Sequence, residues 1–200
     1  MLSGPSGTGK DSILRELKKD RNDFVVSISC TTRQPRLGEV NGKDYYFLGK
    51  SEFMEMVKAG KMLEWAKFCD NYYGTPKEKL NELLASGMNV ILEIEVQGAK
   101  QVIENSPDAV SVFVLPPSIE VLKQRLQKRA LDSHEDIGKR VSEAEREIPL
   151  AYEYDYTIVN DDLKRCASDI SKIIDAENMK TAQNKNIIRE VLNDERIVSR

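Results

Sequence analysis

One segment near the start of the chain constrains the fold most, because its glycines and lysine have the spacing of a phosphate-binding loop. The segment reads Gly4, Pro5, Ser6, Gly7, Thr8, Gly9 and Lys10. Glycines let successive backbone N–H groups turn toward one anion, and a helix that starts just after Lys10 adds its positive N-terminal end. A glycine-rich turn without a ligand is the alternative. The spacing, the lysine and the helical pattern together favour a phosphate site in an α/β protein.

The loop differs from the usual pattern in two respects. The residue after the lysine is Asp11 rather than Ser or Thr, and a hydroxyl follows only at Ser12. A magnesium ion is therefore expected to contact Ser12, or Asp11 through water, or mainly the phosphates of a nucleotide. Only Met1 and Leu2 precede Ser3, so the strand that leads into such a loop is expected to be almost missing.

Short apolar runs alternate with helical patterns along the rest of the chain. The expected buried strands are 24–28, 90–94, 110–115 and 156–159. The expected helices are 12–20, 77–85, 97–104 and 119–127. Strands that alternate with helices predict a doubly wound, mostly parallel sheet with helices on its faces.

Two segments interrupt this alternation and divide one domain into parts. Residues 33–76 are rich in aromatic residues around a helical stretch at 51–59, which predicts an inserted α/β subdomain. The charged segment 125–146 predicts a mobile helical lid. The core then comprises 1–32, 77–124 and 147–180, and 181–200 form a C-terminal tail of unassigned role.

The composition excludes several classes of protein. With 40% hydrophobic residues, 32% charged residues and a net charge of −3, the chain lacks the basic surface of a non-specific nucleic-acid binder. Its three cysteines contain no CxxC pair, and one histidine does not complete a metal site. No apolar run approaches the ~20 residues of a membrane span, so we expect a cytoplasmic protein, either monomer or homo-oligomer.

A second cluster of anion-binding groups follows the first loop. Arg33 and Arg36 bracket a proline, and guanidinium groups there can bind a phosphate with two parallel hydrogen bonds. The hydroxyls of Tyr45 and Tyr73 can add directional donors. Either arginine alone would be read as part of a solvated basic loop. Together these residues predict a second phosphate site.

At this point the sequence closely resembles guanylate kinase of the bacterial type. The matching blocks are GPSGTGK, SISCTTRQPRLGEVNGKDYYF, LEWAKFCDNYYGTP, ILEIEVQGA and YTIVNDD, in the family's order from residue 3 to about 162. The resemblance implies a P-loop nucleoside-monophosphate kinase fold in which 33–76 bind GMP. It also implies phosphoryl transfer from ATP to GMP, and to dGMP, with Mg²⁺ as the metal and no nucleic-acid or membrane partner.

The resemblance also assigns roles to individual residues. ATP phosphates would be bound by the loop from Gly4 to Lys10 with Asp11 and Ser12, and the adenine side by Asn160. The GMP phosphate would be bound by Arg33, Arg36, Tyr45 and Tyr73, and guanine by Ser29, Glu64, Thr75 and Glu95, with Glu93 also on the substrate side. Arg125, Arg129 and Arg140 would close over the transferred phosphoryl group beside Lys10. Family members often have aspartate at the positions of Glu93 and Glu95, so their individual contacts stay open.

Guanine chemistry agrees independently with a carboxylate at Glu64. Guanine presents N–H donors at N1 and N2, which an ionised carboxylate accepts, whereas adenine presents an acceptor at N1 that repels it. A site of this kind rejects the wrong base by about 10⁴-fold, because its buried polar groups are left unpaired. The charged residues of the lid and the ends of the strands are, taken alone, equally typical of solvated surface.

Two other functions compete with this one. A scaffold domain of the same fold binds phosphorylated peptides without catalysis, but such domains generally lose the phosphate loop that this chain keeps. A related kinase could act on another phosphorylated acceptor, for example a ribose phosphate. Glu64 with Tyr73 and Thr75 favours a guanine base.

Overall fold

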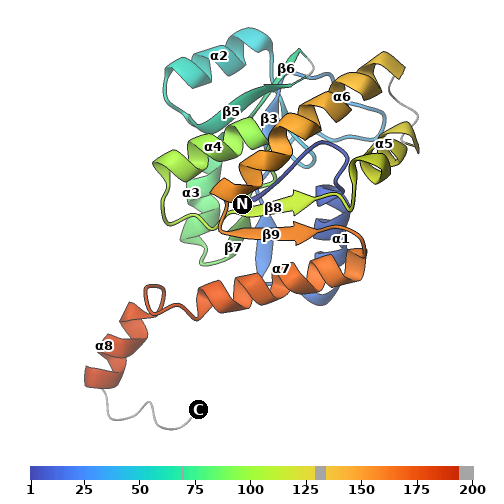
Figure 1. Ribbon diagram of the computed structural model, residues 1–200. Helices are drawn as coiled ribbons and strands as arrows, with labels where there is room; N and C mark the ends of the chain where they lie inside the picture. The colour runs from blue at the N-terminus through green and yellow to red at the C-terminus, as the bar shows by residue number, and fades with distance from the viewer. Residues whose placement is uncertain (69, 129–133, 194–200) are drawn as a thin grey trace.

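The structure, a computed structural model, describes residues 1–68, 70–128 and 134–193 (Figure 1). Its strands are β1 (Leu2–Ser3), β2 (Phe24–Val26), β3 (Cys30–Thr31), β4 (Tyr46–Phe47), β5 (Met62–Phe68), β6 (Asn71–Pro76), β7 (Asn89–Ile91), β8 (Val112–Leu115) and β9 (Tyr156–Val159). Its helices are α1 (Lys10–Asp20), α2 (Lys50–Lys58), α3 (Lys77–Ala85), α4 (Val96–Asn105), α5 (Ile119–Lys128), α6 (His134–Glu147), the 3₁₀ helix η1 (Ile148–Glu153), α7 (Leu163–Asn178) and α8 (Lys185–Asn193). The predicted alternation of strands and helices is confirmed.

A parallel sheet forms the centre of the molecule. β1, β8 and β9 pair in parallel, as do β2 and β7. Leu2 joins the two groups, because its N–H donates to Leu92 O at 2.7 Å and its carbonyl accepts from Ile94 N at 3.2 Å. The resulting order is β2-β7-β1-β8-β9. The strand expected to be almost missing is two residues long, and it lies in the middle of this sheet.

Helices cover both faces of the central sheet. On one face, α1 and α7 bury Ile13, Leu17 and Ile170 against the strands. On the other face, α3 and α4 contribute Leu80 and Val102 to a second cluster. Burial of apolar surface on both sides explains why the strands are continuous apolar runs instead of alternating ones.

A second, smaller sheet forms the inserted subdomain, at the top of Figure 1. Its strands run in the order β4-β3-β6-β5, and α2 packs on it through the fully buried Phe53. The insertion was predicted to begin at residue 33, but its sheet already includes Cys30 and Thr31 in β3. β3 is only two residues long, which is too short to show the period of a strand.

The segment predicted as a lid forms α6 with the end of α5. Leu122 and Leu126 of α5 pack on Ile137 and Ala144 of α6 in a cluster of their own. α6 runs beside the space between the two sheets in Figure 1. Arg129, predicted to act in the lid, lies outside the described residues.

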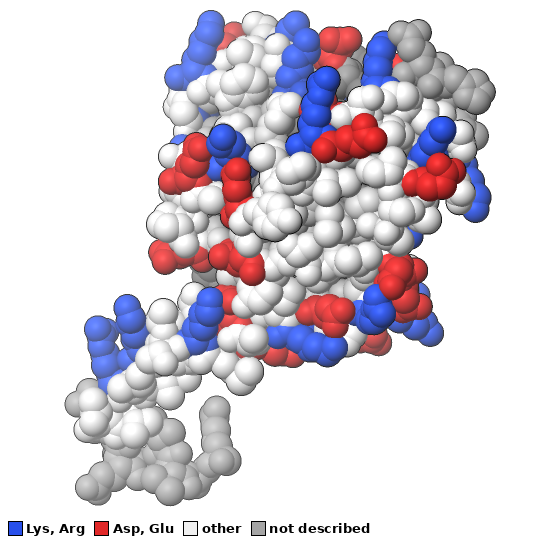
Figure 2. All heavy atoms as spheres, viewed as in Figure 1, with Lys and Arg blue, Asp and Glu red and all other residues white. Residues whose placement is uncertain are grey.

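The tail continues as α8, which extends away from the body of the molecule (Figure 1). The apolar residues Ile187, Ile188, Val191 and Leu192 of this helix are exposed. On the face shown in Figure 2, basic and acidic side chains are interspersed, in line with the small net charge. No helix in the described part of the chain is long and apolar enough to cross a membrane.

Candidate active site

The phosphate loop connects β1 to α1 and owes its shape to glycine. Gly4 has φ +138°, and a Cβ atom there would lie 2.4 Å from the carbonyl oxygen of Val114 in β8. Gly9 has φ +92° at the N-cap of α1, a left-handed backbone conformation that residues other than glycine rarely adopt. In the first turn of α1 the N–H of Ser12 donates to Gly9 O at 3.0 Å, and the N–H groups before it belong to those that a helix N-terminus leaves without an intrahelical partner. They therefore form an anion site at its positive end.

Lys10 is held at the mouth of this loop. Its ammonium group donates to Gly4 O at 2.5 Å and to Pro5 O at 3.3 Å, and the residue is only 9% exposed. The hydroxyl of Thr8 also donates to Pro5 O, at 2.9 Å. These bonds fix the loop before a phosphate binds, so the lysine charge is already in place.

Asn160 and Arg125 brace the loop from the side of β9 and α5. The Asn160 amide donates to Thr8 O at 2.6 Å, and Arg125 donates to Asn160 O at 2.7 Å and to Thr8 O at 3.3 Å. Neither side chain lines the cavities beside the loop. The roles predicted for them at adenine and at the phosphoryl group stay predictions; in this structure they support the loop backbone.

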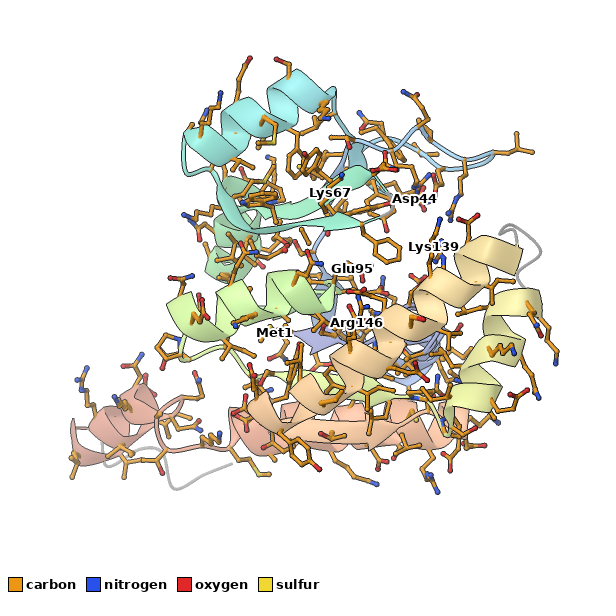
Figure 3. All side chains as sticks on the ribbon, turned by 45° about the horizontal axis from the view of Figure 1, so that its top comes forward. Met1, Asp44, Lys67, Glu95, Lys139 and Arg146 are labelled. Carbon is orange, nitrogen blue, oxygen red and sulfur yellow. The ribbon has the colours of Figure 1, made fainter. Side chains whose placement is uncertain are left out.

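A cavity of about 520 Å³ lies between the two sheets, next to the loop. The predicted residues that line it are Lys10, Asp11, Ser29, Arg33, Arg36, Tyr45, Glu64, Tyr73, Glu93 and Glu95. A smaller cavity of about 210 Å³ shares several of them and adds Ser6, Gly7, Gly9 and Arg140. Figure 3 shows Glu95 at the start of α4, facing the space between the small sheet and α6. The structure thus brings both predicted phosphate sites to one cleft.

Arg33 is fixed by Glu39, a residue to which the sequence analysis gave no role. Two parallel hydrogen bonds join the guanidinium to the Glu39 carboxylate at 2.8 and 2.9 Å, and the backbone N–H of Arg36 donates to the same carboxylate at 2.6 Å. The Arg33 guanidinium also lies over the ring of Tyr45, 5.5 Å from its centroid. Arg33 holds the pKa of Glu39 below its usual range. The sequence contains one signal for this pair, because Glu39 follows Arg33 by six residues in the same loop.

Glu64 and Thr75 form a buried pair across β5 and β6. The Thr75 hydroxyl donates to Glu64 Oε1 at 2.7 Å, and the two residues are 3% and 1% exposed. Burial raises the pKa of Glu64 to about 7, although the hydrogen bond from Thr75 opposes the shift. Glu64 lines the large cavity, where its carboxylate can accept from N–H donors of a base, whereas Thr75 lies behind it and does not line the cavity.

Further carboxylates meet beside the loop. Burial and then the neighbouring charge of Asp11 raise the pKa of Glu93 above its usual range. Glu147, which the sequence analysis missed, has its pKa raised to about 7 by burial and by Glu95. Ser12 is partly buried, accepts from Arg15 at 3.5 Å and lines neither cavity, whereas Asp11 lines both.

Arg140 reaches the loop from α6. Its guanidinium donates to the Ser6 hydroxyl at 2.9 Å and lies 5.3 Å from the ring centroid of Phe68 in β5. One side chain therefore joins the lid segment, the phosphate loop and the inserted subdomain.

A phosphate loop and a second basic cluster that share one cleft define the class of P-loop nucleoside-monophosphate kinases. The family model for guanylate kinase matches residues 1–177. A guanylate kinase of Clostridioides difficile (strain 630) is 47% identical over 195 residues, covering 98% of this chain and 95% of that protein. One from Rickettsia felis is 52% identical over 180 residues, covering 90% and 94%. This chain belongs to the guanylate kinase family.

The fold comparison agrees. The crystal structure of guanylate kinase from Anaplasma phagocytophilum matches with a TM-score of 0.74 and 36% sequence identity, covering 91% of this chain and 86% of that chain. The predicted fold class and the assignment to an enzyme of the nucleoside-monophosphate kinase type are confirmed. The alternative of a non-catalytic peptide-binding module receives no support from these comparisons.

Proposed function

We propose that this member of the guanylate kinase family transfers the terminal phosphoryl group of ATP to GMP in the cleft between its two sheets. The observation that carries the proposal is the shared cavity. Lys10 lines it from the phosphate loop, and Arg33, Arg36 and Glu64 line it from the inserted subdomain. The donor and acceptor phosphates would meet between these walls.

The acceptor needs no activation by the protein. The GMP phosphate is already a nucleophile at neutral pH, and no histidine or cysteine is among the described residues that line either cavity. Catalysis would consist of positioning the two phosphates and neutralising their charge. Lys10 and Arg140 would contribute positive charge on the donor side, and Arg33 and Arg36 on the acceptor side. Closure around both substrates would exclude water and suppress hydrolysis of ATP.

The family implies ATP as co-substrate with a divalent metal, and we propose Mg²⁺ as that metal. Asp11 lies beside Glu93 next to the loop, close enough to raise the pKa of the Glu93 carboxyl. Mg²⁺ typically binds one or two carboxylates together with substrate phosphates, so these residues fit it. No group of three or more potential ligands occurs in the described part of the chain, so the phosphates would supply the rest. When bound, the metal would neutralise phosphate charge.

The guanine base would be recognised by Glu64, whose carboxylate accepts from Thr75, and Ser29 and Glu95 line the same cavity. An ADP-release assay with GMP, AMP, UMP and CMP as acceptors tests the proposal. We expect GMP to exceed AMP in kcat/KM by about 10⁴-fold, because AMP would leave the buried carboxylate unpaired. Equal use of AMP and GMP would exclude base recognition by Glu64 and with it this function.

A further inference from the structure

Gly98 occupies a position in α4 where glycine is unfavourable by itself. It is the third residue of the helix, it is buried, and its φ is not positive. Glycine inside a helix costs backbone entropy that alanine does not, so a packing or functional reason is expected.

The reason lies in the side chain of Glu64. A Cβ atom built on Gly98 would lie 2.0 Å from Glu64 Oε2, 2.9 Å from its carboxyl carbon and 3.5 Å from its Cγ, and these are the three nearest atoms. The Glu64 carboxylate therefore occupies the place where a larger residue at position 98 would have its Cβ atom. The obstacle is the end of one side chain and not a backbone or a packed core.

The carboxylate has little freedom to move within this arrangement. Thr75 fixes its other oxygen at 2.7 Å, and only 3% of Glu64 is exposed. A methyl group at residue 98 would displace the end of the Glu64 side chain and break the bond to Thr75. The helix propensity of residue 98 would increase, but the Glu64 carboxylate would lose its position.

We propose that Gly98 is a positioning residue that determines base specificity by holding open the place of the Glu64 carboxylate. The inference rests on the proposed function, in which Glu64 accepts hydrogen bonds from N1–H and N2–H of guanine. Gly98 itself would not touch the nucleotide. Its effect should therefore concentrate in the recognition of GMP and spare the recognition of ATP.

The first test is Gly98→Ala, measured by steady-state kinetics, GMP calorimetry and thermal unfolding. We expect the KM and Kd for GMP to rise roughly 10- to 100-fold, because a displacement of about 1 Å at a positioning group has effects of this size. The KM for ATP should change less than about twofold, since the phosphate loop is untouched. Gly138→Ala is the matched control, because Gly138 is also helical and has nothing within 4 Å of an added Cβ.

Base selectivity gives a second readout, which a loss of stability would not change. IMP lacks the 2-amino group of GMP, so an intact Glu64 contact favours GMP. Gly98→Ala should reduce the ratio of kcat/KM for GMP over IMP at least fivefold, because the carboxylate that reads N2–H has moved. An unchanged ratio, with an unchanged KM for GMP, would overturn the proposal.

A double variant keeps the test valid if Gly98→Ala folds poorly. Glu64→Asp shortens the side chain by one methylene group, so its carboxylate no longer extends to the place of Glu64 Oε2, 2.0 Å from the added Cβ. The double variant should therefore bind GMP about as well as Glu64→Asp alone. If both changes simply add, residues 64 and 98 act independently and the inference is wrong. If the parent enzyme neither binds nor phosphorylates GMP, the proposed function itself is wrong.

Discussion

The donor loop and the acceptor pocket are built in different ways. The donor loop is a continuous segment from Gly4 to Lys10, and it binds through backbone N–H groups whose direction is fixed by glycine. The acceptor pocket consists of side chains from separate segments on both sheets, including Arg33, Glu64 and Glu93. A site made of backbone is encoded locally, whereas a site made of side chains exists only after the chain has folded.

The two walls also differ in how their charges are held. Lys10 is fixed by two carbonyl oxygens of its own loop. On the acceptor wall, Arg33 is paired with Glu39, while the guanidinium of Arg36 makes no hydrogen bond within the described residues. On the acceptor wall, Arg33 is therefore held in place by Glu39, whereas the Arg36 guanidinium would be positioned by the substrate.

The largest effect should follow from removing the charge of the donor loop. Lys10→Ala should lower kcat/KM by about 10³-fold or more, because a preorganised charge beside the transferred phosphoryl group is lost. Steady-state kinetics with GMP and thermal unfolding measure the effect. Lys19→Ala is the control, since Lys19 is exposed on the same helix and, among the residues that the structure describes, pairs with Glu16 alone. Near-normal turnover of the Lys10 variant would mean that the loop does not bind the reacting phosphate.

Removing charge from the acceptor wall should act on the other substrate. Arg36→Ala should raise the KM for GMP by about 100-fold through the loss of charge-assisted hydrogen bonds, and turnover should fall as well. The KM for ATP should stay within a few-fold of the parent value. Initial rates with each substrate varied in turn separate the two walls. Equal increases in both KM values would show that the walls are not distinct sites.

Recognition of guanine should depend on pH. Because burial raises the pKa of Glu64 to about 7, the carboxylate that accepts from guanine becomes protonated as the pH falls. The KM for GMP should rise about 10-fold from pH 8 to pH 6, as expected for one group of this pKa. The KM for GMP of the parent enzyme is divided by the KM of Glu64→Gln at each pH, because this ratio cancels the effect of the titration of the GMP phosphate. A constant ratio would contradict ionic recognition by Glu64.

The same shift predicts the opposite trend for folding. A carboxyl group whose pKa is raised in the folded state stabilises it below the unfolded pKa of about 4.5, and this contribution is lost as the pH rises through about 7. Binding of GMP and stability of the free enzyme therefore favour opposite protonation states of Glu64.

Sequence reasoning predicted the donor loop from the glycine spacing, the lysine and the helical pattern that follows, because residues 4–10 are neighbours in the chain. It also predicted the alternation of strands and helices from apolar runs. In the acceptor pocket, the phosphate site was predicted from Arg33 and Arg36, but adding Glu64 to it required the resemblance to a family, since no local pattern brings Glu64 into one cavity with Arg33. The bracing of the loop by Asn160 and the pairing of Glu39 with Arg33 depend on tertiary distances and on side-chain direction.

The smallest effect should come from the residues after the phosphate-loop lysine, and it decides how the metal is bound. Ser12 lines neither cavity, so Ser12→Ala should leave the Mg²⁺ dependence within about twofold of the parent enzyme. Asp11 lines both and lies beside Glu93, so Asp11→Asn should raise the half-saturating Mg²⁺ concentration about fivefold by removing one carboxylate. Titration of activity with Mg²⁺, together with tryptophan fluorescence without nucleotide, compares the two variants. A stronger effect of Ser12→Ala than of Asp11→Asn would mean that the Ser12 hydroxyl binds the metal, as in phosphate loops of the usual sequence. Asp11 would then have no role in metal binding on the donor wall.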